Sequence, residues 1–182
     1  MANLDGPFGF RSVRPNAGGT SGRLTNYTIA SGYTSSIFYG DAVIDAGSGV
    51  LEVAAATDAA ILGIFQGCSY DDEAGRPKFS RYWPADQVAT NIVAQVNLPD
   101  GETYLVQSTT VAAANIGQYC DLVAGAGDPA TGNSGFEIDG TTYNAASTGL
   151  TFQVVRIANS PDNAAGADAN IEVRVIAKQL GA

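Results

Sequence analysis

Three consecutive carboxylates, Asp71, Asp72 and Glu73, are the densest group of side chains that could carry out acid–base chemistry. Glycoside hydrolases use two carboxylates, as acid and base or as acid and nucleophile, on opposite sides of the bond that breaks. Such a pair normally comes from separate rigid elements, whereas these three residues are adjacent in a loop-like stretch. We therefore predict a solvated, charged turn, with a catalytic pair as the alternative.

The sequence contains no histidine, the commonest general base and metal ligand. Serine–histidine–aspartate and cysteine–histidine catalytic sites are therefore excluded. Near the C-terminus we expect a polar loop, with a weak calcium site as the alternative. The spacing of the oxygen-bearing residues there differs from that of the ligands in an EF-hand loop. These residues are Asp162, Asp168, Asn170 and Glu172. We predict a protein that is not an enzyme and has no cofactor.

The two cysteines, Cys68 and Cys120, do not have the paired spacing of a zinc site. We predict two buried, reduced thiols, with a disulfide as the alternative. The first residues include no continuous apolar stretch typical of a signal peptide, and no apolar run is long enough to span a membrane. We therefore expect synthesis in a cytoplasm and no membrane partner.

Two segments combine basic and aromatic side chains, the composition of interface residues that contribute most binding energy. They are "FGFRSVRP" (8–15) and "GRPKFSRYWP" (75–84), which holds the only tryptophan. Two alternatives stay open for the second segment: its aromatic residues pack in a hairpin core, or they form a platform for nucleic acid or sugar. The candidate interface residues are Phe8, Phe10, Arg11, Arg14, Arg76, Lys78, Phe79, Arg81, Tyr82 and Trp83.

The net charge of −9 argues against nucleic acid as a partner, because phosphate binding requires a cationic surface. The charge is uneven: residues 1–40 carry three arginines and one aspartate, whereas the rest of the chain is strongly acidic. Charged residues are only 15% of the chain, below the usual share. We predict that basic, aromatic elements of one copy meet acidic faces of another copy or of an underlying lattice.

The pattern of the chain is typical of an all-β protein, with short runs of valine, isoleucine, tyrosine and threonine between turn residues. Hairpin signals occur at 47–49 and 99–101, a short helical turn is expected at 110–115, and a polar loop separates the last two strands. We predict a single antiparallel β-barrel or sandwich with long loops. Its strands are expected at 24–31, 41–46, 49–56, 59–70, 91–98, 102–108, 150–159 and 170–180.

The chain divides into an extended N-terminal arm with a glycine-rich hinge (1–22) and a β-rich domain (23–182). The arm is predicted to become ordered only by contact with another molecule, so deletion of residues 1–14 is expected to leave a folded protein. A weak internal similarity links "YGDAVIDAGSG" (39–49) to "YCDLVAGAGDP" (119–129). Either a duplication or shared turn chemistry could explain it.

Five pieces of the chain, in order, resemble a family of tailed-bacteriophage virion structural proteins. They are "MANLDGPFGFRSVR", "YTIASGYTSSIFYGDAV", "GIFQGCSY" with "GRPKFSRYWPAD", "IGQYCDLV" and "RIANSPDNAAGADANIEVRVIAKQ". The resemblance implies a β-rich, non-enzymatic virion component, a capsid decoration (cement) protein on the outer capsid surface.

The implied partners are the major capsid protein and further copies of the chain, with a trimer favoured. Such a protein would bind the shell between capsomers and stabilise the head. Two alternatives stay open. One is a tail- or fibre-associated virion protein, and the other is a receptor- or glycan-binding module that uses Tyr82 and Trp83 as a stacking surface.

Overall fold

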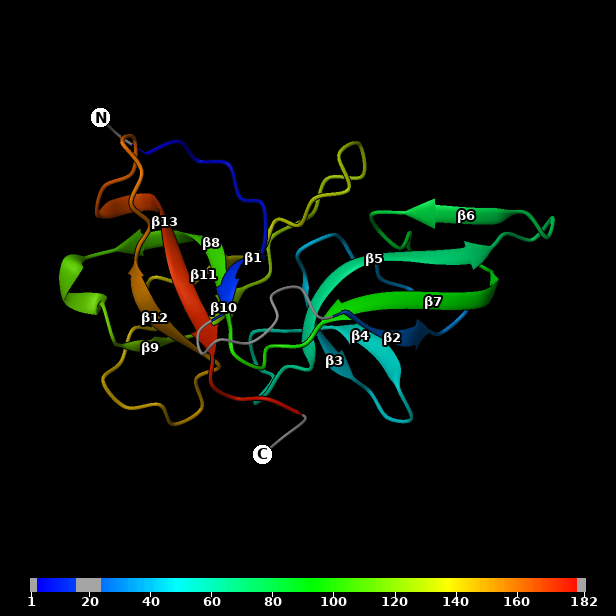
Figure 1. The fold of residues 1–182 in the computed structure, drawn as a ribbon, viewed down its shortest axis with the longest axis horizontal. Coiled ribbons are helices and arrows are strands. Elements are labelled where there is room, and N and C mark those ends of the chain that lie inside the picture. The colour runs from blue at the N-terminus through cyan, green and yellow to red at the C-terminus, as the bar shows by residue number, and fades with distance from the viewer. Residues whose placement is uncertain (1–2, 16–23, 180–182) are drawn as a thin grey trace.

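The computed structural model describes residues 3–15 and 24–179, and it consists almost entirely of β-strands and loops (Figure 1). The predicted all-β class is confirmed. The strands form two barrels, placed side by side along the long axis of the molecule, where the sequence indicates a single barrel or sandwich. A single 3₁₀ turn, Ala113–Asn115, lies where the sequence predicts a helical turn. Within the described ranges, no helix is long and apolar enough to cross a membrane.

The first barrel is a closed sheet with the strand order β3-β4-β2-β7-β5, in which β5 pairs again with β3. Among the described strands, β6 pairs only with the far half of β5. This β5–β6 hairpin projects from the barrel together with the first residues of β7, which pair with the other side of β5 (Figure 1). The strands are β2 (Leu24–Ile29), β3 (Ala42–Asp45), β4 (Val50–Val53), β5 (Gly63–Asp71), β6 (Pro77–Ser80) and β7 (Thr90–Asn97).

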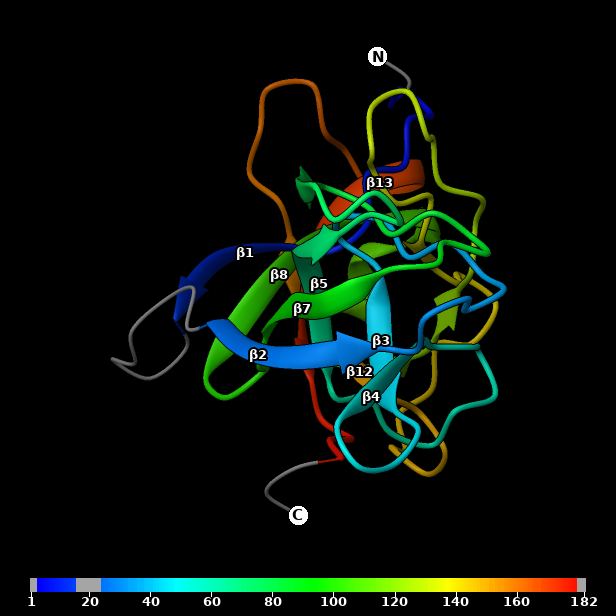
Figure 2. The ribbon, with the colours of Figure 1, turned by 90° about the vertical axis from the view of Figure 1, so that its right-hand side faces the viewer.

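The second barrel is nearly closed and has the order β10-β11-β8-β13-β12-β9. Its ends, β9 and β10, are separated only by Asp121. Strand β1 (Arg11–Pro15) adds to β8 at the edge of this sheet (Figure 2). The other strands are β8 (Glu102–Val111), β9 (Tyr119–Cys120), β10 (Leu122–Val123), β11 (Glu137–Ile138), β12 (Phe152–Ile157) and β13 (Gly166–Val175).

The two barrels have the same strand order and the same strand directions. The first strand of each (β2 or β8) pairs in parallel with the third (β4 or β11) and antiparallel with the last (β7 or β13). The second strand (β3, or β9 with β10) pairs antiparallel with the third and the fourth (β5 or β12). The similar segments 39–49 and 119–129 occupy equivalent places, with Asp41 before β3 and Asp121 before β10. The shared topology favours duplication over shared turn chemistry.

Each barrel has its own cluster of buried side chains, and the clusters are joined. Ala42 and Ile64 of the first barrel pack into the cluster of the second. Cys68 is buried in the first cluster and Cys120 in the second, and both are free, which confirms the prediction of buried, reduced thiols. Burial raises the pKa of Cys68 to about 12 and also raises the pKa of Cys120, so both stay protonated and unreactive near neutral pH.

One predicted hairpin is confirmed and another is wrong. Strands β3 and β4 pair antiparallel across the Gly47–Gly49 turn, as the sequence indicates. Strands β7 and β8 flank the turn at 99–101 but lie in different sheets, because β7 pairs with β2 and β5 while β8 pairs with β13. The turn is therefore the crossing between the two barrels.

The N-terminal segment packs against the chain itself. Asn3 holds the start of β13 and the loop before it, because its side chain donates hydrogen bonds to Ala164 O (2.9 Å) and Ala167 O (2.6 Å). Phe10 is fully buried, and its ring stacks on Phe152 with centroids 4.8 Å apart. The predicted arm is thus extended, but residues 3–15 lie in place without a second molecule. Most of the predicted hinge, residues 16–22, lies outside the described residues.

Candidate interaction surface

The two basic, aromatic segments meet at Tyr39. The guanidinium carbon of Arg11 lies 5.7 Å from the centre of the Tyr39 ring, and that of Arg81 lies 4.5 Å from it. Both guanidinium groups donate to Asn133 Oδ1, at 3.3 Å from Arg11 Nη2 and 3.1 Å from Arg81 Nη2. Arg11 also lies over the ring of Phe8, at 5.1 Å. We call these five residues the arginine cluster.

Four separate parts of the chain supply the arginine cluster. Phe8 and Arg11 come from the N-terminal segment, Tyr39 from the loop before β3, Arg81 from the position directly after β6, and Asn133 from the loop 125–135. The N-terminal segment, the loop 125–135 and β6 follow one side of the molecule, the upper side in Figure 1 and Figure 2. The backbone joins two of these parts directly, since Tyr39 N donates to Gly132 O at 3.0 Å.

Two glycines allow the N-terminal segment to approach the loop that carries Tyr39. Phe10 N donates to Gly40 O at 2.8 Å. Gly9 has a φ of +71°, and a Cβ there would lie 2.4 Å from the Ser134 Cβ and 2.7 Å from Gly40 O. Gly40 has a φ of +96°, which side-chain-bearing residues rarely adopt. Both positions therefore require glycine for Arg11 to reach Tyr39.

A buried carboxylate, Asp41, organises the same loop from below. Asp41 is 2% exposed, and its Oδ2 accepts a hydrogen bond from Phe38 N at 2.7 Å. Burial raises the pKa of Asp41 to about 6, an effect that hydrogen bonds from Ser134 and the Phe38 backbone reduce. Because Asp41 fixes Phe38 and the turn after it, it supports Tyr39 without reaching the surface.

The positive charge of the arginine cluster is not balanced by a neighbouring carboxylate. Among the described residues, neither Arg11 nor Arg81 forms an ion pair. Arg11 Nε is buried and has no hydrogen-bond partner there. The nearby Asp128 accepts hydrogen bonds from Ala130 N (2.9 Å) and Thr131 Oγ1 (3.0 Å) within its own turn. Asn133 thus offers the two cations only a neutral amide oxygen.

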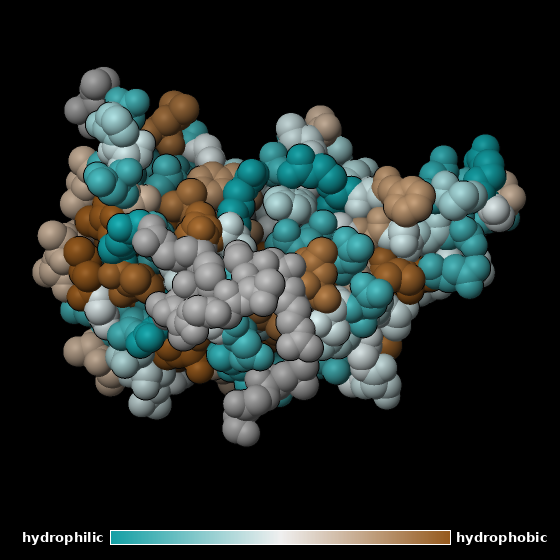
Figure 3. Space-filling view, viewed as in Figure 1, coloured by the Kyte–Doolittle hydropathy of each residue, from teal (hydrophilic) through white to brown (hydrophobic). Residues whose placement is uncertain are grey.

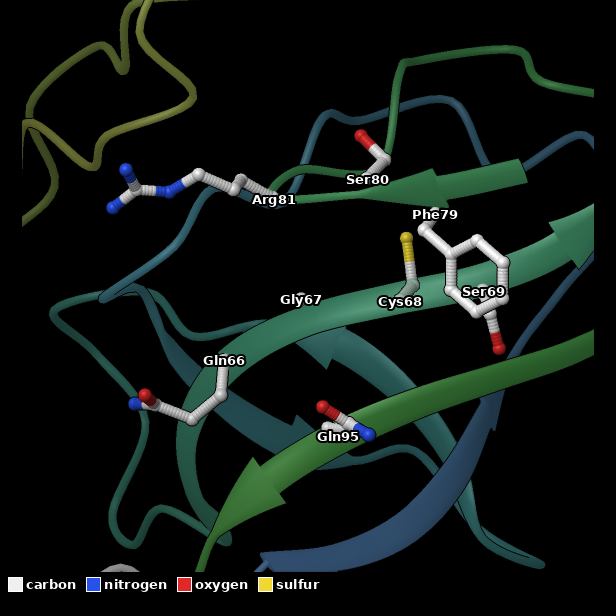
Figure 4. Close-up of a pocket in the computed structure, with 8 residues that line it drawn as sticks. All are labelled: Gln66, Gly67, Cys68, Ser69, Phe79, Ser80, Arg81 and Gln95. Carbon is white, nitrogen blue, oxygen red and sulfur yellow. The ribbon is translucent and has the colours of Figure 1, made fainter.

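The projecting hairpin presents Phe79, which is 86% exposed. A shallow depression of about 310 Å³ lies beside it over the central strand β5 (Figure 4). Gly67 and Ser69 form its floor, and Phe79 and Gln95 stand on either side of them. The space-filling view shows this end of the molecule as mainly hydrophilic, with isolated hydrophobic side chains (Figure 3). Phe79 is therefore an isolated apolar contact point.

Arg76 and Lys78 belong to the structure of the β5–β6 turn. Arg76 Nη2 lies 2.9 Å from Asp72 Oδ2, and Lys78 Nζ lies 4.0 Å from the same oxygen. Asp72 Oδ1 accepts hydrogen bonds from Ala74 N and Arg76 N, and these bonds with the Arg76 side chain lower the pKa of Asp72. This is the charged turn predicted at 71–73, and it leaves these cations less available to a partner.

Two predicted interface residues, Phe10 and Trp83, require correction, and the side chain of a third, Arg14, lies outside the described residues. Phe10 and Trp83 are both fully buried, because Phe10 fills the core of the second barrel and Trp83 that of the first. The core alternative is therefore right for Trp83, and Trp83 cannot act as a glycan-stacking surface. Tyr82 stacks on Phe38 with centroids 5.2 Å apart. Arg14 lies in β1 opposite Thr103, but its side chain is outside the described residues.

Sequence reasoning missed Tyr39 and Asn133, which connect the two arginines. Neither residue stands in a basic stretch, and 94 positions separate them. The sequence signal near Tyr39 is the similarity between 39–49 and 119–129. This similarity indicates where a strand begins and not which residues form a surface. Contacts of this kind depend on how the two barrels are joined.

The polar loop predicted near the C-terminus is only partly right, because Asp162 lies in the loop while Asp168, Asn170 and Glu172 lie in strand β13. Asn163 ties the loop to this strand and to the chain directly after β12. Its side-chain nitrogen donates to Ala158 O and Asn170 O, each at 2.8 Å, and its Oδ1 accepts from Asn170 N at 2.8 Å. In the part of the chain that the structure describes, no group of three or more cysteine, aspartate or glutamate side chains is arranged to hold a metal ion.

Comparison with known proteins adds no relative: no family model matches the chain, and no curated protein matches it. The function is therefore inferred from the arginine cluster, the projecting hairpin and the sequence resemblance described above.

Proposed function

We propose that this protein is a non-enzymatic structural protein of a tailed-phage virion, a capsid decoration protein that binds the outer shell between capsomers and stabilises the head. The observation that carries the proposal is the convergence of two basic, aromatic segments on Tyr39 and Asn133. Arginine and aromatic side chains that share a surface are typical of protein-binding sites. The proposal also rests on the family resemblance of the sequence.

The architecture supports a role in assembly. The first barrel is closed, and this removes the free edges that would otherwise promote uncontrolled pairing. Strand β6 keeps one edge without a partner among the described strands, and it carries the exposed Phe79. The edge of β6 lies next to the apolar side chain of Phe79 and to the arginine cluster with its two cations, Arg11 and Arg81. Such an edge can accept an extended segment of another chain.

The proposed partners are the major capsid protein and further copies of this chain, with a trimer as the favoured oligomer. Each copy offers only a small set of contact residues, so a single contact would be weak. Several copies joined on a symmetric lattice bind together, and the second and third contacts form at a high effective concentration. An oligomer therefore converts a weak contact into stable decoration.

Binding to matching capsid shells tests the proposal. We expect the purified protein to co-sediment with expanded, undecorated shells and not with immature ones. Phe79→Ala and Arg81→Gln should each weaken the apparent affinity by about tenfold, as the loss of an interface contact worth ~1.4 kcal/mol does. Ile116→Ala is the control for Phe79, because Ile116 is also an exposed apolar residue at 47%.

Two outcomes would contradict the proposal. One is the absence of co-sedimentation with expanded shells by the unaltered protein. The other is antibody labelling of intact virions at the tail or fibres only, which would favour the alternative of a tail-associated protein.

A further inference from the structure

We infer that Arg11 and Arg81 form a clamp for one oxyanion, a carboxylate or phosphate group, which binds beside Asn133 and bridges the two guanidinium groups. As a contact to a partner this inference rests on the proposed function, whereas binding of the anion itself can be measured on the protein alone. The clamp is a binding site with a defined ligand chemistry, and its residues Arg11, Arg81 and Asn133 come from three separate parts of the chain.

The geometry of the clamp follows from two hydrogen bonds. Arg11 Nη2 and Arg81 Nη2 lie 3.3 Å and 3.1 Å from the same Asn133 Oδ1. The two nitrogen atoms are therefore no farther apart than the sum of these distances. A carboxylate or phosphate has two or more oxygens and can accept hydrogen bonds from both guanidinium groups at once.

The charges around the clamp favour an anion. Two like charges this close repel each other unless a counter-charge lies between them. Among the described residues no carboxylate forms an ion pair with either arginine, and the contacts of the two guanidinium groups are with aromatic rings and one amide oxygen. Cation–π contacts hold the guanidinium groups in place but leave their N–H groups free to donate.

The clamp is accessible and has a donor without a partner. Arg81 is exposed, and Arg11 is partly exposed beside a hollow of about 320 Å³ that Phe8, Arg11 and Leu105 line. Arg11 Nε is buried and finds no acceptor within the described residues. Buried donors are nearly always hydrogen-bonded, so this one marks a place where an acceptor is missing.

Thermal unfolding of the isolated protein at low ionic strength tests the clamp. We expect sodium phosphate or sodium glutarate at 10 mM to raise Tm by about 3 °C if Kd is about 1 mM, relative to sodium chloride at equal ionic strength. The Arg Nε–Hε signals of Arg11 and Arg81 in NMR spectra should shift with the same concentration dependence. A response to glutarate alone assigns the clamp to carboxylates, and a response to phosphate alone assigns it to phosphate groups.

Four variants make the test specific. Arg11→Gln and Arg81→Gln should each abolish the response. Arg76→Gln removes the same charge from an arginine that Asp72 already neutralises, so this variant should keep the full response. Asn133→Asp places a carboxylate between the two arginines, so it should raise Tm without added anion and remove the response to added anion.

The inference is overturned if chloride raises Tm as much as phosphate and glutarate do, or if Arg76→Gln loses as much of the response as Arg81→Gln. It is also overturned if Asn133→Asp keeps the full response. Failure of these tests leaves shell binding through Phe79 to be judged separately. If the protein responds to added anion but does not bind shells, the clamp is retained and the capsid is ruled out as its partner.

Discussion

Asp41 is a buried carboxylate, and its pKa of about 6 makes the stability of the protein depend on pH. The folded state binds this proton more tightly than the unfolded chain, whose pKa is near the usual 3.8. The stabilisation that comes from the protonated form of Asp41 is therefore complete below about pH 4 and is lost as the pH rises through 6. Above pH 7 the buried charge lowers the free energy of unfolding on the order of 2–3 kcal/mol.

We predict that Asp41→Asn removes this pH dependence and keeps an acceptor for Phe38 N. Between pH 4 and pH 7 the unaltered protein should lose on the order of 2–3 kcal/mol more stability than the variant. Urea unfolding across this range measures the difference. Because Asp121 and Glu137 also have raised pKa values, only the difference between the two proteins is diagnostic, and parallel pH profiles would contradict the prediction.

Phe10 changes from a candidate anchor for another molecule to a core residue of its own chain. Its ring contacts Phe152 and Tyr104, with centroids 4.8 Å and 6.5 Å away. We predict that Phe10→Ala lowers the free energy of unfolding by about 3–5 kcal/mol, as truncation of a buried phenylalanine does. Phe8→Ala, which alters a partly exposed ring, should cost less, and equal costs in urea unfolding would show that Phe10 is not packed as described.

At the scale of elements, the N-terminal segment is the largest change from the sequence-based expectation. Deletion of residues 1–14 removes Phe10 and most of β1, which pairs with β8. We now predict that this variant is less stable by at least about 3 kcal/mol, the cost of the lost phenylalanine alone. Circular dichroism during urea unfolding measures the change. A deletion variant as stable as the full chain would restore the view of the segment as an arm ordered only by contact.

The longer strands of both barrels could be predicted from the sequence, whereas β1, β6, β9 and β10 were missed. Of the strand partners, only those joined by a short connection could be predicted. The β3–β4 hairpin has a short turn, so local chemistry determines both its strands and their pairing. The turn at 99–101 has similar chemistry, but β7 and β8 find their partners far away in the sequence. Long-range pairing depends on the whole barrel, and the pattern of one segment does not contain it.

Only part of the candidate site could be predicted, because the sequence shows local patterns and not long-range contacts. Composition alone identified Arg11, Arg81 and Phe79, because exposed cations and aromatic residues are visible as a local pattern. It could not separate Phe79, which is 86% exposed, from Trp83, which is fully buried. The two residues are four positions apart, so alternation along a continuous strand would place both on the same face. They differ because β6 ends at Ser80, before Trp83.

At the scale of the molecule, the two barrels share a topology and differ in the strands that are added to it. In the first barrel, the projecting β6 follows the fourth strand, β5, in the chain and pairs with it. In the second barrel, β1 pairs with the first strand, β8. These two additions bring Arg81 and Arg11 together at Tyr39. The candidate surface therefore arises where two copies of one architecture differ, and this is why neither barrel alone would form it.

The measurement that tests the proposed function most directly is a density map of the intact virion into which this structure is fitted. We predict density for both barrels on the outside of the head, between capsomers, with Phe79, Arg11 and Arg81 facing the shell and an acidic side chain beside Asn133. Density at the tail, or on the head with the arginine cluster facing solvent, would contradict this account.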